Sequence, residues 1–150
     1  WLDVPAMLRA SEVLMEFPMV DQDPLPRWTF GRVTRLGDAA HPMVPRGSNG
    51  AGQSILDARC LADLLARHGE DAEAALRAYE AVRLPATTQV VLTNRTNPPD
   101  AILREEFLRT SDRPFGRIEE VMSREEMLAI TGGYKRVAGY DLATLQAHRV

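Results

Sequence analysis

The sequence predicts an α/β protein that is mostly helical, with a few strands. Three observations support this class. Apolar residues recur at every second position over residues 12–20, which is typical of one face of a strand. A loop rich in proline and glycine follows over residues 41–52. Beyond it, apolar residues recur at helical spacing, and several helical stretches carry their own start and stop signals.

The first part of the chain is expected to hold two strands and a connector. The first strand, over residues 12–20, places four apolar side chains on one face: Val13, Met15, Phe17 and Met19. Pro24 and Pro26 then break the pattern, because proline lacks an N–H donor and restricts the preceding residue. Residues 31–36 are predicted to form a second, short strand that ends at Gly37 and Asp38.

The central segment is predicted to be a shaped loop followed by a long helix. Two prolines and three glycines lie between His41 and Gly52, too many for a regular element. Ala51, Ile55 and Leu65 then fall at helical spacing, and Gly69 stands where a C-terminal cap is expected. We therefore expect a helix over about residues 50–68.

Further helices are predicted toward the C-terminus. One spans residues 71–83 and is ended or bent by Pro85. A helical continuation over 86–97 is the open alternative, which β-branched residues disfavour. Another, over 101–109, follows the N-cap residue Asp100. Ser123 and Glu126 have the spacing of a capping box, which predicts a short helix ending near residue 130, before two glycines.

Composition excludes several classes of function. Eighteen basic and 21 acidic residues are interspersed, which argues against a nucleic-acid partner. No apolar run reaches the roughly 20 residues that span a membrane. The single cysteine, Cys60, excludes an internal disulfide, and we expect a cytoplasmic protein. His41, His68 and His148 are too scattered to predict a metal site.

Residues 31–62 form the unit with the clearest chemical character. A strand leads to Asp38, then to the proline and glycine loop, and then to a helix N-terminus. The first N–H groups of a helix lack partners and carry roughly half a positive charge, which suits an anionic or electron-rich ligand group. Glycines at 47, 50 and 52 allow a flat ligand to approach the backbone. Asp38 is placed to accept hydrogen bonds from ligand hydroxyl groups.

This unit resembles a known motif. The run from Gly37 to His41, followed by Pro45, Gly47, Gly50 and Asp57, resembles the second FAD motif of the group A flavoprotein monooxygenases, the relatives of para-hydroxybenzoate hydroxylase. The likeness is greatest to the phenazine-modifying branch of these aromatic hydroxylases. Five other stretches of the chain are similar to that branch: 23–28, 42–50, 83–86, 94–95 and 134–136.

The resemblance implies the C-terminal portion of a Rossmann-like FAD-binding monooxygenase fold. Residues 1–30 would be a remnant of the substrate-domain sheet and its connector, and residues 31–150 the FAD-ring-binding segment with the C-terminal helices. No G-x-G-x-x-G follows a strand, so the ADP-binding βαβ unit is absent from this chain. Because the chain also begins at Trp1, we expect a longer enzyme, of which this part alone is inactive.

The resemblance also implies roles for individual residues. Asp38 would bind the ribityl hydroxyls of FAD, and the N–H groups of Ala51 and Gly52 would meet the flavin N1–C2 carbonyl edge. Pro45 would line the space between flavin and substrate. Met43 has two open interpretations, a core residue or a border of the substrate pocket. The full cofactor-binding set is Gly37, Asp38, Pro45, Gly47, Asn49, Gly50, Ala51 and Gly52.

In this family NAD(P)H reduces the flavin, and molecular oxygen forms a C4a-hydroperoxide that hydroxylates a small aromatic or heteroaromatic substrate. The cofactor supplies the chemistry, so no catalytic side chain is expected. A hydrolase triad of His41 with Asp38 and Ser48 is disfavoured, because no G-x-S-x-G turn is present. Two alternatives remain open: a truncated helical module that keeps the fold without binding flavin, and a flavin oxidase or reductase that does not hydroxylate.

Overall fold

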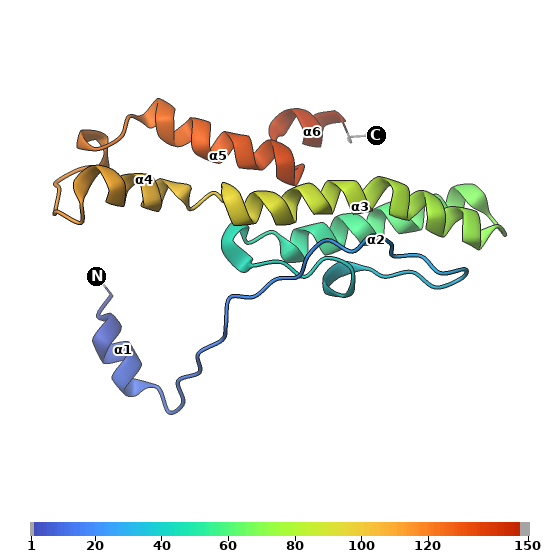
Figure 1. Cartoon of the computed structure of the whole chain (residues 1–150), viewed down its shortest axis with the longest axis horizontal. Helices are drawn as coiled ribbons and strands as arrows, with labels where there is room; N and C mark the ends of the chain where they lie inside the picture. The colour runs from blue at the N-terminus through green and yellow to red at the C-terminus, as the bar shows by residue number, and fades with distance from the viewer. Residues whose placement is uncertain (1, 148–150) are drawn as a thin grey trace.

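A computed structural model describes residues 2–147 and shows a predominantly helical chain (Figure 1). His148 lies outside the described residues. Six α-helices follow one another within the described part: α1 (Val4–Ala10), α2 (Gly50–His68), α3 (Ala72–Thr96), α4 (Ala101–Thr110), α5 (Arg124–Ala138) and α6 (Leu142–Ala147). None of the described helices is long and apolar enough to cross a membrane. The expectation of a mostly helical protein is confirmed.

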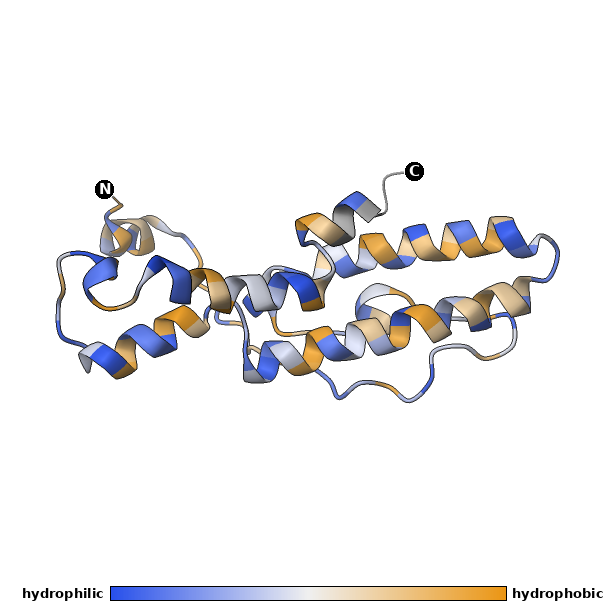
Figure 2. Cartoon of the chain, turned by 90° about the horizontal axis from the view of Figure 1, so that it is seen from above, coloured by the Kyte–Doolittle hydropathy of each residue, from blue (hydrophilic) through white to orange (hydrophobic). Residues whose placement is uncertain are grey.

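Helices α2 and α3 form a hairpin that holds the core. The two helices lie side by side, joined by the short turn after Gly69, and apolar and polar residues alternate along both of them (Figure 2). Trp28 and Tyr79 are almost fully buried, with ring centroids 5.8 Å apart. Leu25, Cys60, Leu61, Leu64 and Leu84 pack against this cluster. The connector before α2 is thereby fixed to the hairpin.

Helix α3 runs through Pro85 without ending, so of the outcomes predicted for this residue the stop is wrong and the helical continuation over 86–97 is the one that forms. Proline costs a hydrogen bond in a helix interior, but side chains on both sides of Pro85 are buried. Arg83, Thr87 and Asn94 share the buried face with two valines, and the Thr87 hydroxyl donates to the carbonyl of Arg83 at 3.0 Å. The continuous buried face therefore outweighs the local cost of the proline.

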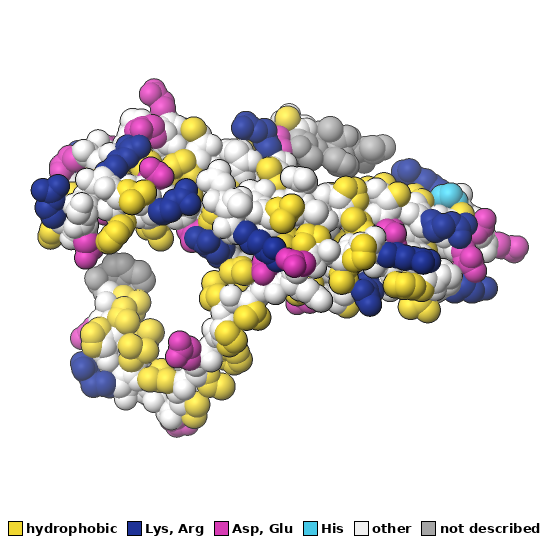
Figure 3. All heavy atoms as spheres, in the orientation of Figure 1, with side chains coloured by type: hydrophobic (Ala, Val, Ile, Leu, Met, Phe, Trp, Pro, Cys, Tyr) yellow, Lys and Arg dark blue, Asp and Glu magenta, His cyan; other side chains and the backbone are white. Residues whose placement is uncertain are grey.

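The two strands predicted near the N-terminus do not form. Over residues 12–20 no ladder is present, and Val13, Met15 and Phe17 are 69%, 74% and 76% exposed. Figure 3 shows apolar side chains gathered along this arm, which extends away from the helices. A strand needs a neighbouring strand to pair with its backbone groups, and no described residue provides one.

The strand predicted over residues 31–36 is also wrong. A single antiparallel bridge joins Phe30 to Val33 across a tight turn at Gly31, whose φ is +59°. The backbone then continues as a loop that is fixed by side chains. The hydroxyl of Tyr79 donates to the carbonyl of Arg35 at 3.3 Å. The turn brings Phe30 back onto Val33, so the segment has no second strand beside it.

Helices α4 and α5 extend the hairpin. Helix α4 nearly continues the line of α3, and α5 runs back along both of them (Figure 1). The prediction for α4 is confirmed to within one residue at its C-terminal end, whereas α5 continues past Gly132 and ends before Gly139, at φ +78°. The burial of Tyr134 and Ala138 against the hairpin explains why the two glycines do not end the helix.

The capping box of α5 provides a test of its N-terminus. The Ser123 hydroxyl accepts from the N–H of Glu126 at 3.2 Å, and the Glu126 carboxylate accepts from the N–H of Ser123 at 2.8 Å. We expect Ser123→Ala to lower the free energy of unfolding by about 1 kcal/mol, measured by urea denaturation. Ser123→Thr keeps the acceptor and should retain most of this stability; an alanine variant as stable as the parent would contradict the role of the cap.

Candidate functional site

The candidate site is the 37–52 loop, which runs from the 3₁₀ turn Gly37–Ala39 to the first turn of α2. A second 3₁₀ turn, Pro45–Gly47, is closed by Ser48 in the left-handed region at φ +49°. Between residues 42 and 49 the only hydrogen bond with both partners in the backbone joins the N–H of Ser48 to the carbonyl of Pro45. The position of the loop therefore depends on contacts with the helices around it.

The loop presents one acceptor and several donors that are free to bind a ligand. Asp38 is exposed and forms no hydrogen bond or ion pair with another described residue. At the start of α2, the N–H groups of Gly50, Ala51 and Gly52 have no acceptor in the described part of the chain. Asn49 occupies the N-cap without a side-chain capping bond. The helix N-terminus thus keeps its partial positive charge available.

The other predicted site residues surround these groups. Ala51 and Pro45 are exposed, whereas Met43, Gly50 and Gly52 are half-buried. A Cβ added at Gly50 would lie 3.7 Å from Cγ of Met43, so Met43 lies next to the start of the helix. Gly37 is buried with φ +59°, which favours glycine at this turn. At the start of α2, Ala51 is thus exposed, whereas Gly52 is half-buried beside the Asn49 side chain.

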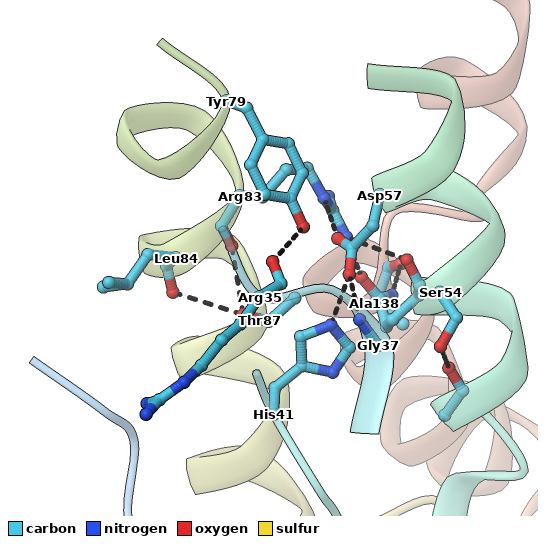
Figure 4. Close-up of polar contacts among 12 residues, drawn as sticks. Arg35, Gly37, His41, Ser54, Asp57, Tyr79, Arg83, Leu84, Thr87 and Ala138 are labelled. Atoms are coloured by element: carbon cyan, nitrogen blue, oxygen red, sulfur yellow. Dashed lines mark hydrogen bonds and ion pairs between the residues drawn. The ribbon is translucent and has the colours of Figure 1, made fainter. Parts of the chain in front are cut away.

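A buried polar network centred on Asp57 holds the first half of the loop (Figure 4). Asp57 is fully buried in α2 and accepts three hydrogen bonds: from the N–H of Gly37 at 3.1 Å, from Nε2 of His41 at 2.5 Å and from Nε of Arg83 at 2.7 Å. Burial acts to raise the pKa of Asp57, but the hydrogen bonds outweigh it and hold the pKa below its ordinary value. The ionised carboxylate therefore ties the loop to both helices.

The same network reaches α5. Nη2 of Arg83 donates to Oε1 of Gln53 at 2.6 Å, and Nε2 of Gln53 donates to the carbonyl of Ala138 at 2.8 Å. Gln53 is 2% exposed and lies in the first turn of α2. Three helices are therefore linked through side chains directly behind the free amide groups.

His41 has a structural role in this arrangement. Its ring bonds to Asp57 and neither to Asp38 nor to Ser48, so the three groups of a hydrolase triad are not assembled. Its second nitrogen, Nδ1, is buried and has no hydrogen-bond partner within residues 2–147. His41 thus fixes the loop to α2 through a buried hydrogen bond to Asp57.

Four residues that hold the loop had no role assigned from sequence: Asp57, Arg83, Asn94 and Tyr134. Each lies in a stretch that carries the family resemblance, which is the signal that points to them. Arg83 and Asn94 also share one face of α3 with the buried Tyr79, Val90 and Val91. A charged or amide side chain in the middle of an apolar helix face indicates a buried partner.

The donor and acceptor set of the loop fits the isoalloxazine end of FAD. Asp38 is an ionisable acceptor for sugar-alcohol hydroxyls, and the amides of residues 50–52 are donors for a carbonyl edge that becomes electron-rich on reduction. The half-buried glycines at 50 and 52 leave the backbone open to a planar ring. These observations agree with the resemblance of the motif.

Comparison with known proteins also points to FAD as the ligand of this family. A family described as FAD binding domain matches residues 15–94, more than half of the chain. Phenazine 1,6-dicarboxylic acid hydroxylase PhzS of Lysobacter antibioticus is 44% identical over 137 residues, which cover 91% of this chain and 31% of the relative.

Two further relatives cover 74% of this chain. 3-Amino-4-hydroxybenzoate 2-monooxygenase PtnB3 of Streptomyces platensis is 40% identical over 119 residues, 30% of its length. 6-Hydroxynicotinate 3-monooxygenase of Bordetella bronchiseptica is 35% identical over 112 residues, 27% of its length. The chain thus spans about a third of the length of these relatives. With its family match extending from the exposed arm to Asn94 of α3, the chain belongs to the FAD binding domain family.

Proposed function

We propose that the intact protein is an FAD- and NAD(P)H-dependent monooxygenase that hydroxylates a small aromatic or heteroaromatic compound. This chain is its flavin-ring-binding and C-terminal portion. The observation that carries the proposal is the pairing of a free carboxylate, Asp38, with the free amides of residues 50–52 on one loop. Buried hydrogen bonds to Asp57 hold the first half of the loop in place, and they use none of the free groups named above.

Each part of the loop has a defined task in this proposal. Asp38 accepts hydrogen bonds from the ribityl hydroxyls, and the amides of Ala51 and Gly52 bind the N1–C2 carbonyl edge of the ring. Pro45 and Met43 border the space shared by the ring and the substrate. Bound FAD, reduced by NAD(P)H, supplies the redox chemistry with molecular oxygen. The helix N-terminus stabilises negative charge on the reduced ring.

The remainder of the enzyme is assigned in outline. We place the ADP-binding unit of a Rossmann-like fold and most of the substrate domain in residues outside this chain. Residues 1–30 are a remnant of the substrate-domain sheet and the connector that leads to the hairpin in this assignment. The arm exposes apolar side chains, seen in Figure 3, and we propose that the substrate domain packs against them.

The substrate class rests on the relatives. Their names specify phenazine dicarboxylic acid, amino-hydroxybenzoate and hydroxynicotinate as substrates of those proteins. All three are aromatic or heteroaromatic acids of modest size. We propose a substrate of the same kind here, tested by NAD(P)H consumption that depends on the aromatic compound and by incorporation of labelled oxygen into the product. Oxidation of NAD(P)H without labelled product would favour an oxidase or reductase.

Asp38→Ala in the full-length protein is expected to weaken FAD binding by about 1 to 3 kcal/mol, the scale for losing a charged hydrogen-bond acceptor. FAD binding is measured by fluorescence titration of the apoprotein. Asp63→Ala is the matched control, because Asp63 is an exposed carboxylate on α2 whose ion pair, among the residues that the structure describes, is with Arg59. Equal affinities for the Asp38→Ala and Asp63→Ala variants would show that Asp38 does not contact the cofactor.

A further inference from the structure

Helix α5 contacts the first turn of α2 and the loop before it through two residues one turn apart. Tyr134 and Ala138 are 1% and 2% exposed, and positions four residues apart lie on the same face of a helix. The carbonyl of Ala138 accepts from Gln53, as described above. Tyr134 lies against the 37–52 loop at Gly47.

The hydroxyl of Tyr134 is the centre of a second buried polar chain. It donates to Oδ1 of Asn94 at 2.7 Å, and Nδ2 of Asn94 donates to the carbonyl of Val44 at 3.4 Å. Burial raises the pKa of the Tyr134 hydroxyl above its ordinary value, although neighbouring Asn49 and Asn94 act in the opposite direction. The hydroxyl therefore stays protonated and serves as a donor within the fold.

The loop lies directly against this hydroxyl. A Cβ placed on Gly47 would lie 1.9 Å from Oη and 2.4 Å from Cζ of Tyr134, far inside contact distance. The tyrosine thus occupies the space of a side chain at position 47. Residues 42–49 have almost no hydrogen bonds within their own backbone, so contacts with groups outside the loop set where it lies. At Gly47 that contact is the Tyr134 ring, and at Arg46 it is the ion pair with Asp100.

We infer that Tyr134 is a positioning residue for the flavin-ring site, acting through Gly47 and Asn94 to hold the loop that leads into the free amides of residues 50–52. The inference rests on the proposed function. Tyr134 is buried behind the loop, so it sets the cofactor's affinity without touching the cofactor.

Tyr134→Phe in the full-length protein tests the inference, with Tyr140→Phe as the matched control. Tyr140→Phe also removes a phenolic hydroxyl, and the Tyr140 ring lies beside the Tyr134 ring with centroids 6.4 Å apart. Tyr140 is, however, 37% exposed, and its hydroxyl forms no hydrogen bond to the loop within the described residues. We expect the dissociation constant of FAD to rise roughly 5- to 10-fold in Tyr134→Phe, the scale of one lost hydrogen bond, and less than about twofold in Tyr140→Phe. The absorption bands of the bound flavin should shift only in Tyr134→Phe.

The FAD titrations are made under conditions in which circular dichroism shows that each apoprotein is folded. A general loss of stability then does not affect the measured dissociation constant. If Tyr134→Phe does not fold, Asn94→Ala, which removes the link to Val44, is expected to weaken FAD binding in the same way. If the parent protein binds FAD and the Tyr134→Phe and Tyr140→Phe variants bind it with equal affinity, the inference is overturned and the proposed function stands. A parent protein that binds no FAD would overturn the proposed function itself.

Discussion

Asp57→Asn is expected to lower the free energy of unfolding by about 3 to 5 kcal/mol at neutral pH, the range for breaking one partner of a buried ion pair. The substitution preserves shape but removes the charge that faces Arg83 at 2.7 Å. Because Arg83 is only 8% exposed, water cannot replace the lost partner. The hydrogen bond from the Gly37 N–H also weakens when its acceptor becomes neutral.

The dependence on pH gives this prediction a second readout. The pKa of Asp57 is lower in the folded protein than in the unfolded chain, so its contribution to stability is present above about pH 4 and is lost as the pH falls through the folded pKa. The asparagine variant has no such group. The stability difference between parent and variant should therefore be constant near neutral pH and shrink in acid.

Asp63→Asn is the matched control for urea denaturation. It makes the same substitution in an exposed pair on the same helix, where Asp63 lies 3.0 Å from Arg59 and its side chain is 44% exposed. Exposed pairs of this kind contribute about 0.5 kcal/mol or less. Equal losses in the two variants would contradict the assignment of Asp57 as the buried anchor of the loop.

Local signals predicted the elements that carry their own boundaries. The N-terminus of α5 was predicted from the Ser123 and Glu126 capping box, and the C-terminus of α2 from Gly69, and both are confirmed. The same kind of signal failed at Gly132, and at Pro85 the helix continues instead of stopping, because burial of one face of α5 and of α3 outweighs local preference there. Whether a helix continues depends on packing that only the folded chain shows.

The predicted strands failed for a different physical reason. Alternation over residues 12–20 shows that one face of the segment is apolar. A strand also requires a neighbouring strand that forms hydrogen bonds with its backbone. The described chain provides none, so the pattern appears as an exposed arm. Alternation therefore identifies an apolar face without showing what covers it.

The candidate site was predictable in part. Its exposed groups, Asp38 and the amides of residues 50–52, follow from the order of turn, loop and helix in the sequence, and their contact with FAD remains a prediction. The buried groups behind them were not assigned. Arg83 and Tyr134 lie 26 and 77 residues from Asp57 along the chain, and only the packing of α3 and α5 brings them to the loop.

Gly47→Ala is expected to lower the free energy of unfolding by about 3 kcal/mol, at the upper end for overpacking a buried contact. The added methyl group would lie 1.9 Å from the Tyr134 hydroxyl, and the ring has no free space to retreat because it is 1% exposed and bonded to Asn94. Removing the hydroxyl does not cure the clash, since Cζ is 2.4 Å away. Tyr134→Phe should therefore not rescue Gly47→Ala.

Gly132→Ala is the control that separates this clash from a general effect of replacing glycine. Gly132 lies within α5, and a Cβ there meets no atom within 4 Å. Alanine at that position should stabilise the protein by about 0.5 to 1 kcal/mol, because glycine costs more backbone entropy in a helix. Opposite signs for the two variants in urea denaturation are expected. A Gly47→Ala variant as stable as the parent would show that the loop does not rest on Tyr134, since no other described contact at residue 47 demands the absence of a side chain.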